Sequence, residues 1–143
     1  MKKHVIPEDV IDWNFFQDYQ ALANISAMEI SDMLAGRPAR TDGIKRLIFK
    51  INGEIDPRYL DRTSVLILNT ALTSSKLYKD KSDTVEGVVR RTRTIISRLE
   101  KISDDYPRIR RSELIKMKEF CHSLYKSDRY YDQLAHLATY SSA

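Results

Sequence analysis

The chain is poor in the residues that interrupt helices or cross-link small folds. Its 143 residues include only four glycines, four prolines and one cysteine. A single cysteine, Cys121, excludes an internal disulfide, and a free thiol is typical of a reducing compartment. The scarcity of glycine and proline leaves long stretches of the chain free to form helices.

Long hydrophobic runs are also missing. The longest uncharged stretch, residues 63–75, is too short and too rich in serine and threonine to cross a bilayer. The N-terminus lacks the apolar segment of a secretory signal. With 42% apolar and 31% charged residues, the composition is typical of a globular protein. We therefore expect a cytoplasmic protein that makes no contact with a membrane.

The common patterns of catalytic and cofactor sites are absent. The four glycines are too far apart for a P-loop or a dinucleotide fingerprint. Cys121 and His122 are adjacent, so on a helix they point about 100° apart and cannot hold one metal ion together. Asp132 and His136 are four residues apart, but two ligands alone make a poor metal site. We therefore predict no bound metal, no cofactor and no enzymatic activity.

Apolar residues recur at helical spacing along most of the chain, which predicts an all-α fold. We expect a compact bundle of about six to seven helices that forms a single domain over residues 1–143. An acidic helix over residues 7–24 and a basic helical region over residues 84–126 belong to it. The stretch from Val65 to Leu72 is apolar nearly all round, which is typical of the buried centre of a bundle. The predicted helix starts are Pro7, a capping box at Ser26–Glu29, Thr41, Asp56–Pro57, an Asp83 cap, the region after Pro107, and Asp128. The predicted helix ends include Gly36 with Pro38, and Asn52–Gly53.

Charge is spread unevenly along the chain, although the net charge is only +4. Residues 1–35 contain two lysines and six acidic residues, a balance of −4. Residues 90–118 contain ten basic and four acidic residues, a balance of +6. This asymmetry favours an anionic partner for the second half of the chain.

The first functional hypothesis is non-enzymatic binding of nucleic acid, or of a nucleoprotein complex, through basic helical faces. Arginine forks match phosphate oxygens, and Tyr106 lies beside three arginines where it could stack on an unpaired base. The alternative is that these cations are only solvated on the outer faces of amphipathic helices. The candidate contacts are Lys45, Arg46, Lys50, Arg90, Arg91, Arg98, Lys101, Arg108, Arg110 and Arg111.

Residues 25–52 resemble a helix-turn-helix. Residues 29–36 resemble its first helix and glycine, and the stretch from Ile44 to Leu47 would begin the recognition helix. The turn is longer than in the motif and contains Pro38. Two ordinary packed helices are the alternative, which we favour.

Arg129 and His136, with six residues between them, resemble the Arg-x(4–6)-His motif of ribonucleases of the HEPN family. The resemblance implies metal-independent RNA cleavage across a dimer interface. Tyr130 stands where the family usually has a polar residue, and a surface histidine is the alternative interpretation.

A protein-directed inhibitor or adaptor is the main alternative function, for example a mobile-element-encoded inhibitor of a bacterial defence complex. Aromatic residues are concentrated near both ends of the chain, and not all of them can face one core. Trp13, Tyr130 and Tyr131 are the candidate anchors of a protein interface, since exposed aromatic residues often dominate binding energy. The pattern leaves the oligomeric state and the identity of the partner open.

Overall fold

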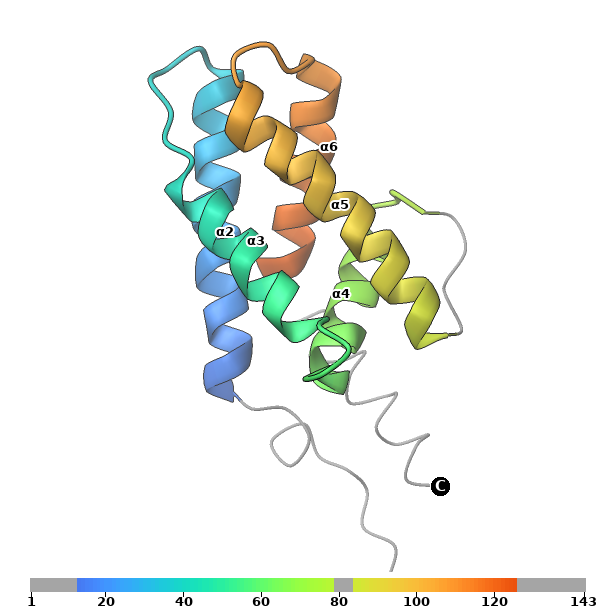
Figure 1. Cartoon of the computed structure of the whole chain (residues 1–143). Helices are drawn as coiled ribbons and strands as arrows, with labels where there is room; N and C mark the ends of the chain where they lie inside the picture. The colour runs from blue at the N-terminus through green and yellow to red at the C-terminus, as the bar shows by residue number, and fades with distance from the viewer. Residues whose placement is uncertain (1–12, 79–83, 126–143) are drawn as a thin grey trace, which may run out of the picture.

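The computed structural model describes residues 13–78 and 84–125, which contain five helices and no strand (Figure 1). The helices are α2 (Trp13–Leu34), α3 (Asp42–Glu54), α4 (Arg62–Ser74), α5 (Val85–Asp105) and α6 (Arg111–Tyr125). The predicted all-α bundle is confirmed, although the described residues form five helices and not six or seven. The helix predicted from Asp128 lies outside the described residues.

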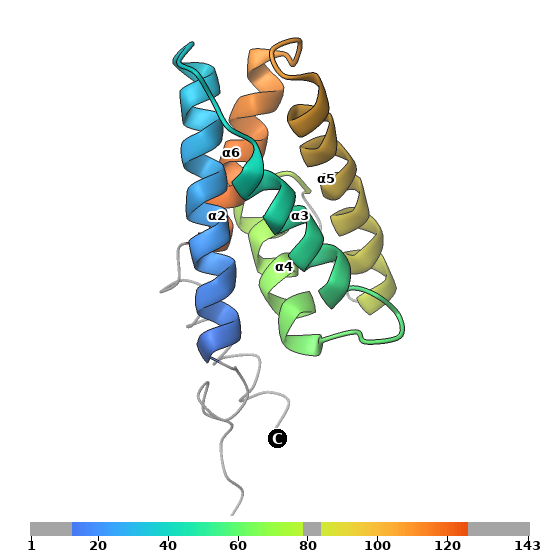
Figure 2. The ribbon, with the colours of Figure 1, turned by 60° about the vertical axis from the view of Figure 1, so that its left-hand side comes forward.

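The five helices surround one core. Helix α2 packs against α6 and α3, α4 packs against α6 and α5, and α3 packs against α5, so the packing closes on itself. Figures 1 and 2 show α3 and α5 side by side on one face of the bundle. No helix in residues 13–78 or 84–125 is long and apolar enough to cross a membrane.

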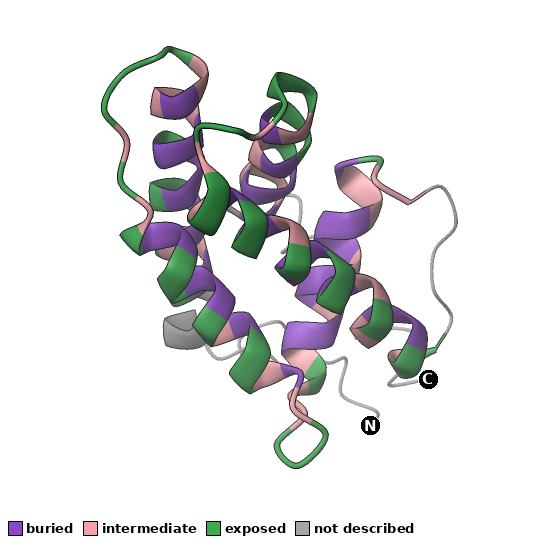
Figure 3. Cartoon of the chain, turned by 45° about the horizontal axis from the view of Figure 1, so that its top comes forward, coloured by how far each residue is buried: buried purple, intermediate pink, exposed green. Residues whose placement is uncertain are grey.

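Each helix contributes its apolar stripe to the core, and Figure 3 shows the exposed residues along the outer sides. The prediction that Val65 to Leu72 forms the buried centre is confirmed, because α4 buries Val65, Ile67, Leu68, Ala71 and Leu72. Complete burial of one large aliphatic side chain stabilises the fold by about 1.5–3 kcal/mol. Burial of these apolar stripes is therefore the main favourable contribution to the association of the helices.

The predicted capping box at Ser26 is wrong, because α2 runs through this position without a break. The Ser26 hydroxyl donates to the carbonyl oxygen of Leu22, one turn earlier, at 2.7 Å. Ser26 has no free N–H group to cap, because N–H groups in the interior of a helix already donate to carbonyl oxygens one turn earlier. The helices expected at residues 7–24 and from Ser26 are one helix over its described part.

Glu29, the other member of the expected capping box, caps a different helix. Its carboxylate accepts hydrogen bonds from the backbone N–H groups of Gly43 and Ile44, both at 2.9 Å. These donors belong to the first turn of α3, where N–H groups have no partner within the helix. Burial raises the pKa of Glu29, and the two N–H groups partly oppose this shift. The side chain therefore ties α2 to the N-terminus of α3.

Two other predicted helix starts are also displaced. Helix α4 begins after Asp61, whose side chain accepts the Ser64 N–H at 3.1 Å, and not at Asp56–Pro57. Asp56 is engaged elsewhere, since it accepts hydrogen bonds from the backbone and guanidinium groups of Arg58. Helix α5 begins after its N-cap Thr84, whose hydroxyl accepts the Gly87 N–H at 3.0 Å, one residue later than the predicted cap.

The ends of the helices are closer to expectation. Gly36 ends α2 as predicted, with a positive φ of 70°. The Gly36 and Arg37 N–H groups donate to the carbonyl oxygens of Met33 and Asp32, which is the Schellman pattern. Helix α3, in contrast, continues through Asn52 and Gly53 to Glu54.

Candidate functional site

The outer face of α3 presents an aromatic ring near two cations. Its inner face is buried through Ile44, Leu47, Ile48 and Ile51, so the residues between them point outward. Phe49 is 82% exposed there. Lys45 and Arg46, one turn earlier on the same side of the helix, are both exposed. We call Lys45, Arg46 and Phe49 the α3 triad.

Lys50 does not share this exposed face, although the sequence placed it with Lys45 and Arg46. It is half-buried, with its Nζ 4.9 Å from the centre of the Tyr19 ring. The same Nζ lies 3.7 Å from a carboxylate oxygen of Glu54. Lys50 is thus engaged in the fold, at the junction of α2 and α3.

The predicted basic face of α5 divides among three surroundings. Arg90 and Lys101 are exposed on the outer side of the helix. Arg91 is half-buried, with its guanidinium 5.5 Å from the centre of the Tyr78 ring. Arg98 faces α6 and pairs with Glu113, so only part of the predicted set is available to a partner.

The Arg98–Glu113 pair is bidentate. Nε and Nη2 of Arg98 donate to the two carboxylate oxygens of Glu113, at 2.7 and 2.6 Å. The hydrogen bonds from Arg98 hold the pKa of Glu113 below its ordinary value. Such paired geometry fixes both side chains and joins α5 to α6.

Exposed carboxylates reduce the charge of the outer side of α5. This side carries the cations Arg90, Arg93 and Lys101, all exposed. It also carries exposed acidic residues, which are Glu86, Glu100 and Asp104. The cations therefore dominate only locally, around Arg90 and Arg93.

The arginines of the α5–α6 turn lie near the end of α2. Arg108, Arg110 and Arg111 are exposed, and Nη1 of Arg111 donates to the carbonyl oxygen of Leu34 at 2.9 Å. Tyr106 is half-buried against the core, and so it does not offer the open ring that the sequence suggested. These arginines follow the C-terminal end of α5. The N-terminal half of α5, in contrast, lies beside the segment that follows α3.

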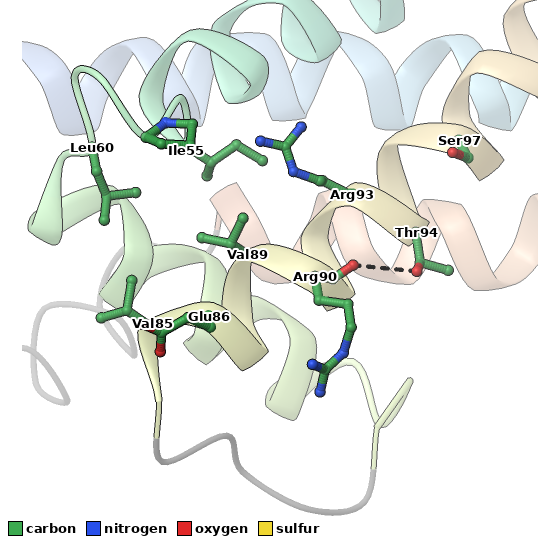
Figure 4. A pocket seen from close by; sticks show the side chains of 10 residues that line it. Ile55, Leu60, Val85, Glu86, Val89, Arg90, Arg93, Thr94 and Ser97 are labelled. Atoms are coloured by element: carbon green, nitrogen blue, oxygen red, sulfur yellow. Dashed lines mark hydrogen bonds between the residues drawn. The ribbon is translucent and has the colours of Figure 1, made fainter.

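An open groove of about 680 Å³ lies between the first half of α5 and the segment after α3 (Figure 4). Its lining is largely aliphatic, and Arg90 and Arg93 border it. The aliphatic part consists of Ile55, Pro57, Leu60, Val85 and Val89. We call this feature the α5 groove.

The loop beside the groove is held by an ion pair. Nη2 of Arg58 lies 2.8 Å from a carboxylate oxygen of Asp56. Hydrogen bonds from Arg58 lower the pKa of Asp56 to about 2. Tyr59, at the tip of the loop, is 70% exposed, and the Arg58 guanidinium lies 5.3 Å from the centre of its ring.

The described residues contain no group of three or more His, Cys, Asp or Glu side chains that could hold a metal ion. Cys121 is fully buried, and burial raises the pKa of its thiol to about 12. A thiol with that pKa stays protonated near neutral pH and is a poor nucleophile.

Several sequence predictions fall outside the described residues. Tyr130 and Tyr131 lie there, as do Arg129 and His136 of the HEPN-like motif. Trp13 begins α2, but its side chain is not described. In the helix-turn-helix resemblance, residues 29–34 are the last part of the 22-residue helix α2, so they are not a separate first helix.

The candidate contacts chosen from the sequence leave out three residues that are exposed in the structure. Phe49 and Tyr59 are strongly exposed aromatic residues, and Arg93 borders the α5 groove. A helical wheel could have found Phe49, because it lies off the apolar stripe of α3. The groove has no local signal, since its walls come from separate segments.

No protein-family model, curated protein or solved structure matches this chain. The geometry and charge of the described surface are therefore the basis on which a function can be inferred. The α3 triad and the α5 groove are its two most distinctive features.

Proposed function

We propose that this protein is a non-enzymatic nucleic-acid-binding protein, acting on nucleic acid directly or within a nucleoprotein complex. We further propose that the α3 triad contacts single-stranded nucleic acid. The observation that carries this proposal is the position of Phe49, 82% exposed beside the exposed cations Lys45 and Arg46.

The chemistry of the triad suits an unpaired strand. An open aromatic ring can stack on a base, which contributes about 1–3 kcal/mol per base and tolerates any sequence. Lysine and arginine beside the ring can contact the phosphates that flank that base. In a duplex the bases are already stacked on one another, so Phe49 would have no free base on which to stack.

The structure narrows the set of candidate contacts. Lys50, Arg91 and Arg98 are half-buried and interact with other residues of the bundle. Arg90 and Lys101 remain exposed, on the helix that packs beside α3. Arg108, Arg110 and Arg111 are exposed at the α5–α6 turn. A nucleic-acid strand bound at the α3 triad would reach them only if it were long enough to extend to that turn.

Binding to labelled single-stranded RNA, single-stranded DNA and duplex DNA at two salt concentrations tests the proposal. We expect tighter binding to single strands and weaker binding at the higher salt concentration. The variant Lys45→Glu/Arg46→Glu should lose most of this affinity and reduce the salt dependence, by roughly 0.7 in log–log slope for each lost phosphate contact.

A matched control is available on α6. The variant Lys116→Glu/Lys118→Glu changes the net charge by the same amount on a helix that packs against α2 and α4. It should bind nearly as well as the unmodified protein. Equal losses in the two double variants would mean that binding follows net charge alone, which contradicts the proposed contact surface.

The alternative function, a protein-directed inhibitor or adaptor, is favoured by a different observation, the α5 groove. Salt separates the two functions, because phosphate contacts weaken steeply with salt and an apolar interface does not.

A further inference from the structure

The floor of the α5 groove is aliphatic, whereas the outer face of α5 beside it is charged. Leu60, Val85 and Val89 are each half-buried and pack against the core while lining the groove. Ile55, at the end of α3, is fully buried beneath them. A partner side chain placed here would remove apolar surface on both molecules from water, which favours binding.

Two arginines border this floor. Arg90 and Arg93 are exposed, and neither forms a salt bridge with another residue that the structure describes. In Figure 4 the Arg93 side chain is directed toward Ile55, whereas the Arg90 side chain is directed away from it. An occupant of the groove therefore meets the Arg93 guanidinium beside Ile55, while Arg90 lies at the border of the groove.

The wall of the groove selects the form of the occupant. It is built largely by α5, whose interior backbone groups are paired within the helix. An extended peptide that adds to a sheet edge needs unpaired backbone groups, which this wall does not offer. A helical segment needs only side-chain contacts, so it is the form that the groove can accept.

The chemistry of the lining favours protein over nucleic acid. None of the described residues that line the groove is aromatic, so a base would find no ring among them on which to stack. Aliphatic side chains match the floor, and carboxylates match the two guanidinium groups. We propose that the α5 groove docks an acidic amphipathic helix of a partner protein.

The order of charges along α5 also predicts the order of charged residues on the partner helix. Glu86 lines the groove near the start of the helix, four residues before Arg90 and seven before Arg93. Seven residues of a helix span about 10 Å. The partner helix should carry carboxylates beside its aliphatic stripe, facing Arg90 and Arg93, and a basic residue about two turns away from them, facing Glu86.

Fluorescence anisotropy with the full chain and two labelled synthetic peptides tests this inference. One peptide is a helix with leucines at the i, i+3, i+4 and i+7 positions, flanked by glutamates. The second peptide has lysine in place of every glutamate. We expect the glutamate peptide to bind at least about tenfold more tightly than the lysine peptide.

The variant Arg90→Glu/Arg93→Glu should invert this preference, so that the lysine peptide becomes the tighter ligand. The control Lys116→Glu/Lys118→Glu has the same net charge and should keep the original preference. Leu60→Ser should weaken both peptides by several-fold without changing their order, because it removes apolar area and no charge. Equal binding of the two peptides, or an unchanged preference in the Arg90→Glu/Arg93→Glu variant, would overturn the proposal.

This inference and the proposed nucleic-acid function can fail separately. Phe49→Ala should leave peptide binding unchanged, since Phe49 does not line the groove. If single-stranded RNA binding requires Arg90 and Arg93 while neither peptide binds, the groove belongs to the nucleic-acid surface and the docked helix is wrong.

Discussion

The carboxylate of Glu29 accepts a hydrogen bond from the backbone nitrogen of Gly43 at 2.9 Å, across the contact between α2 and α3. Thr41, the N-cap residue of α3, makes no capping bond with its own side chain. The first turn of α3 therefore depends on a residue of another helix. This arrangement holds α3, and with it the α3 triad, at a defined position on α2.

Gly43→Ala should destabilise the protein by about 1–3 kcal/mol, as expected for overpacking. A Cβ atom at this position would collide with Cγ2 of Ile25 and lie 3.1 Å from Oε1 of Glu29. Gly53→Ala is the control in the same helix, because a Cβ atom added there would have nothing within 4 Å. It should be neutral or stabilising by up to about 1 kcal/mol through helix propensity. Urea unfolding followed by circular dichroism measures both, and equal effects would contradict the tight α2–α3 contact.

Thr92→Val should stabilise the protein by about 1 kcal/mol, since a buried hydroxyl without a partner costs about 1–3 kcal/mol. Thr92 is fully buried, and its hydroxyl has no hydrogen-bond partner among the described residues. Thr70→Val is the control, because the buried Thr70 donates to the Leu66 carbonyl oxygen at 2.9 Å and would lose that bond. Thermal unfolding should give a higher Tm for the first variant only. A lower Tm for Thr92→Val would show that its hydroxyl is satisfied.

Glu113→Gln should remove part of the pH dependence of stability. Hydrogen bonds from Arg98 lower the pKa of Glu113, so its contribution is present above the unfolded value of about 4.3 and is lost as the pH falls through the lower folded value. We expect a loss of about 1 kcal/mol at pH 7, because the pair is partly exposed, and little difference between variant and parent near pH 3. Unfolding in urea at both pH values measures this, with the exposed Glu119→Gln as control. A difference that does not change with pH would refute the linkage.

Phe49→Ala should weaken nucleic-acid binding and leave the stability of the fold almost unchanged. Because the ring is 82% exposed, we expect the free energy of unfolding to change by no more than about 0.5 kcal/mol. Affinity for single-stranded RNA should fall by roughly 5- to 150-fold, which corresponds to one lost stacking contact. Met28→Ala is the matched control, as Met28 is 60% exposed on α2. If both variants bind RNA as tightly as the parent, Phe49 is not a base-stacking platform.

The elements that local pattern could determine were found from the sequence. The stripe of Ile44, Leu47 and Ile51 predicts α3, and the apolar stretch from Val65 to Leu72 predicts a buried helix, because helical periodicity is set by neighbouring residues. Gly36 ends α2 as expected, since its positive φ is easiest for glycine.

Helix starts were harder to predict, because several residues can cap and only tertiary contacts select among them. Ser26 has the side chain of a cap, yet it lies inside a helix that packs continuously along α6. Asp56 resembles a cap as well, but it pairs with Arg58, and Asp61 takes the role. A motif of three or four residues cannot show where a helix must run to bury its stripe.

The helical class, the apolar stripes and the concentration of positive charge in the second half of the chain follow from local sequence alone. Which cations remain available to a partner depends on the packing of the helices. Arg98 meets Glu113 from 15 positions away, and Arg91 lies over Tyr78, whereas Arg90 and Arg93 border an open groove. The physical reason is that a charge becomes a contact surface or a structural ion pair according to the residues that packing brings beside it.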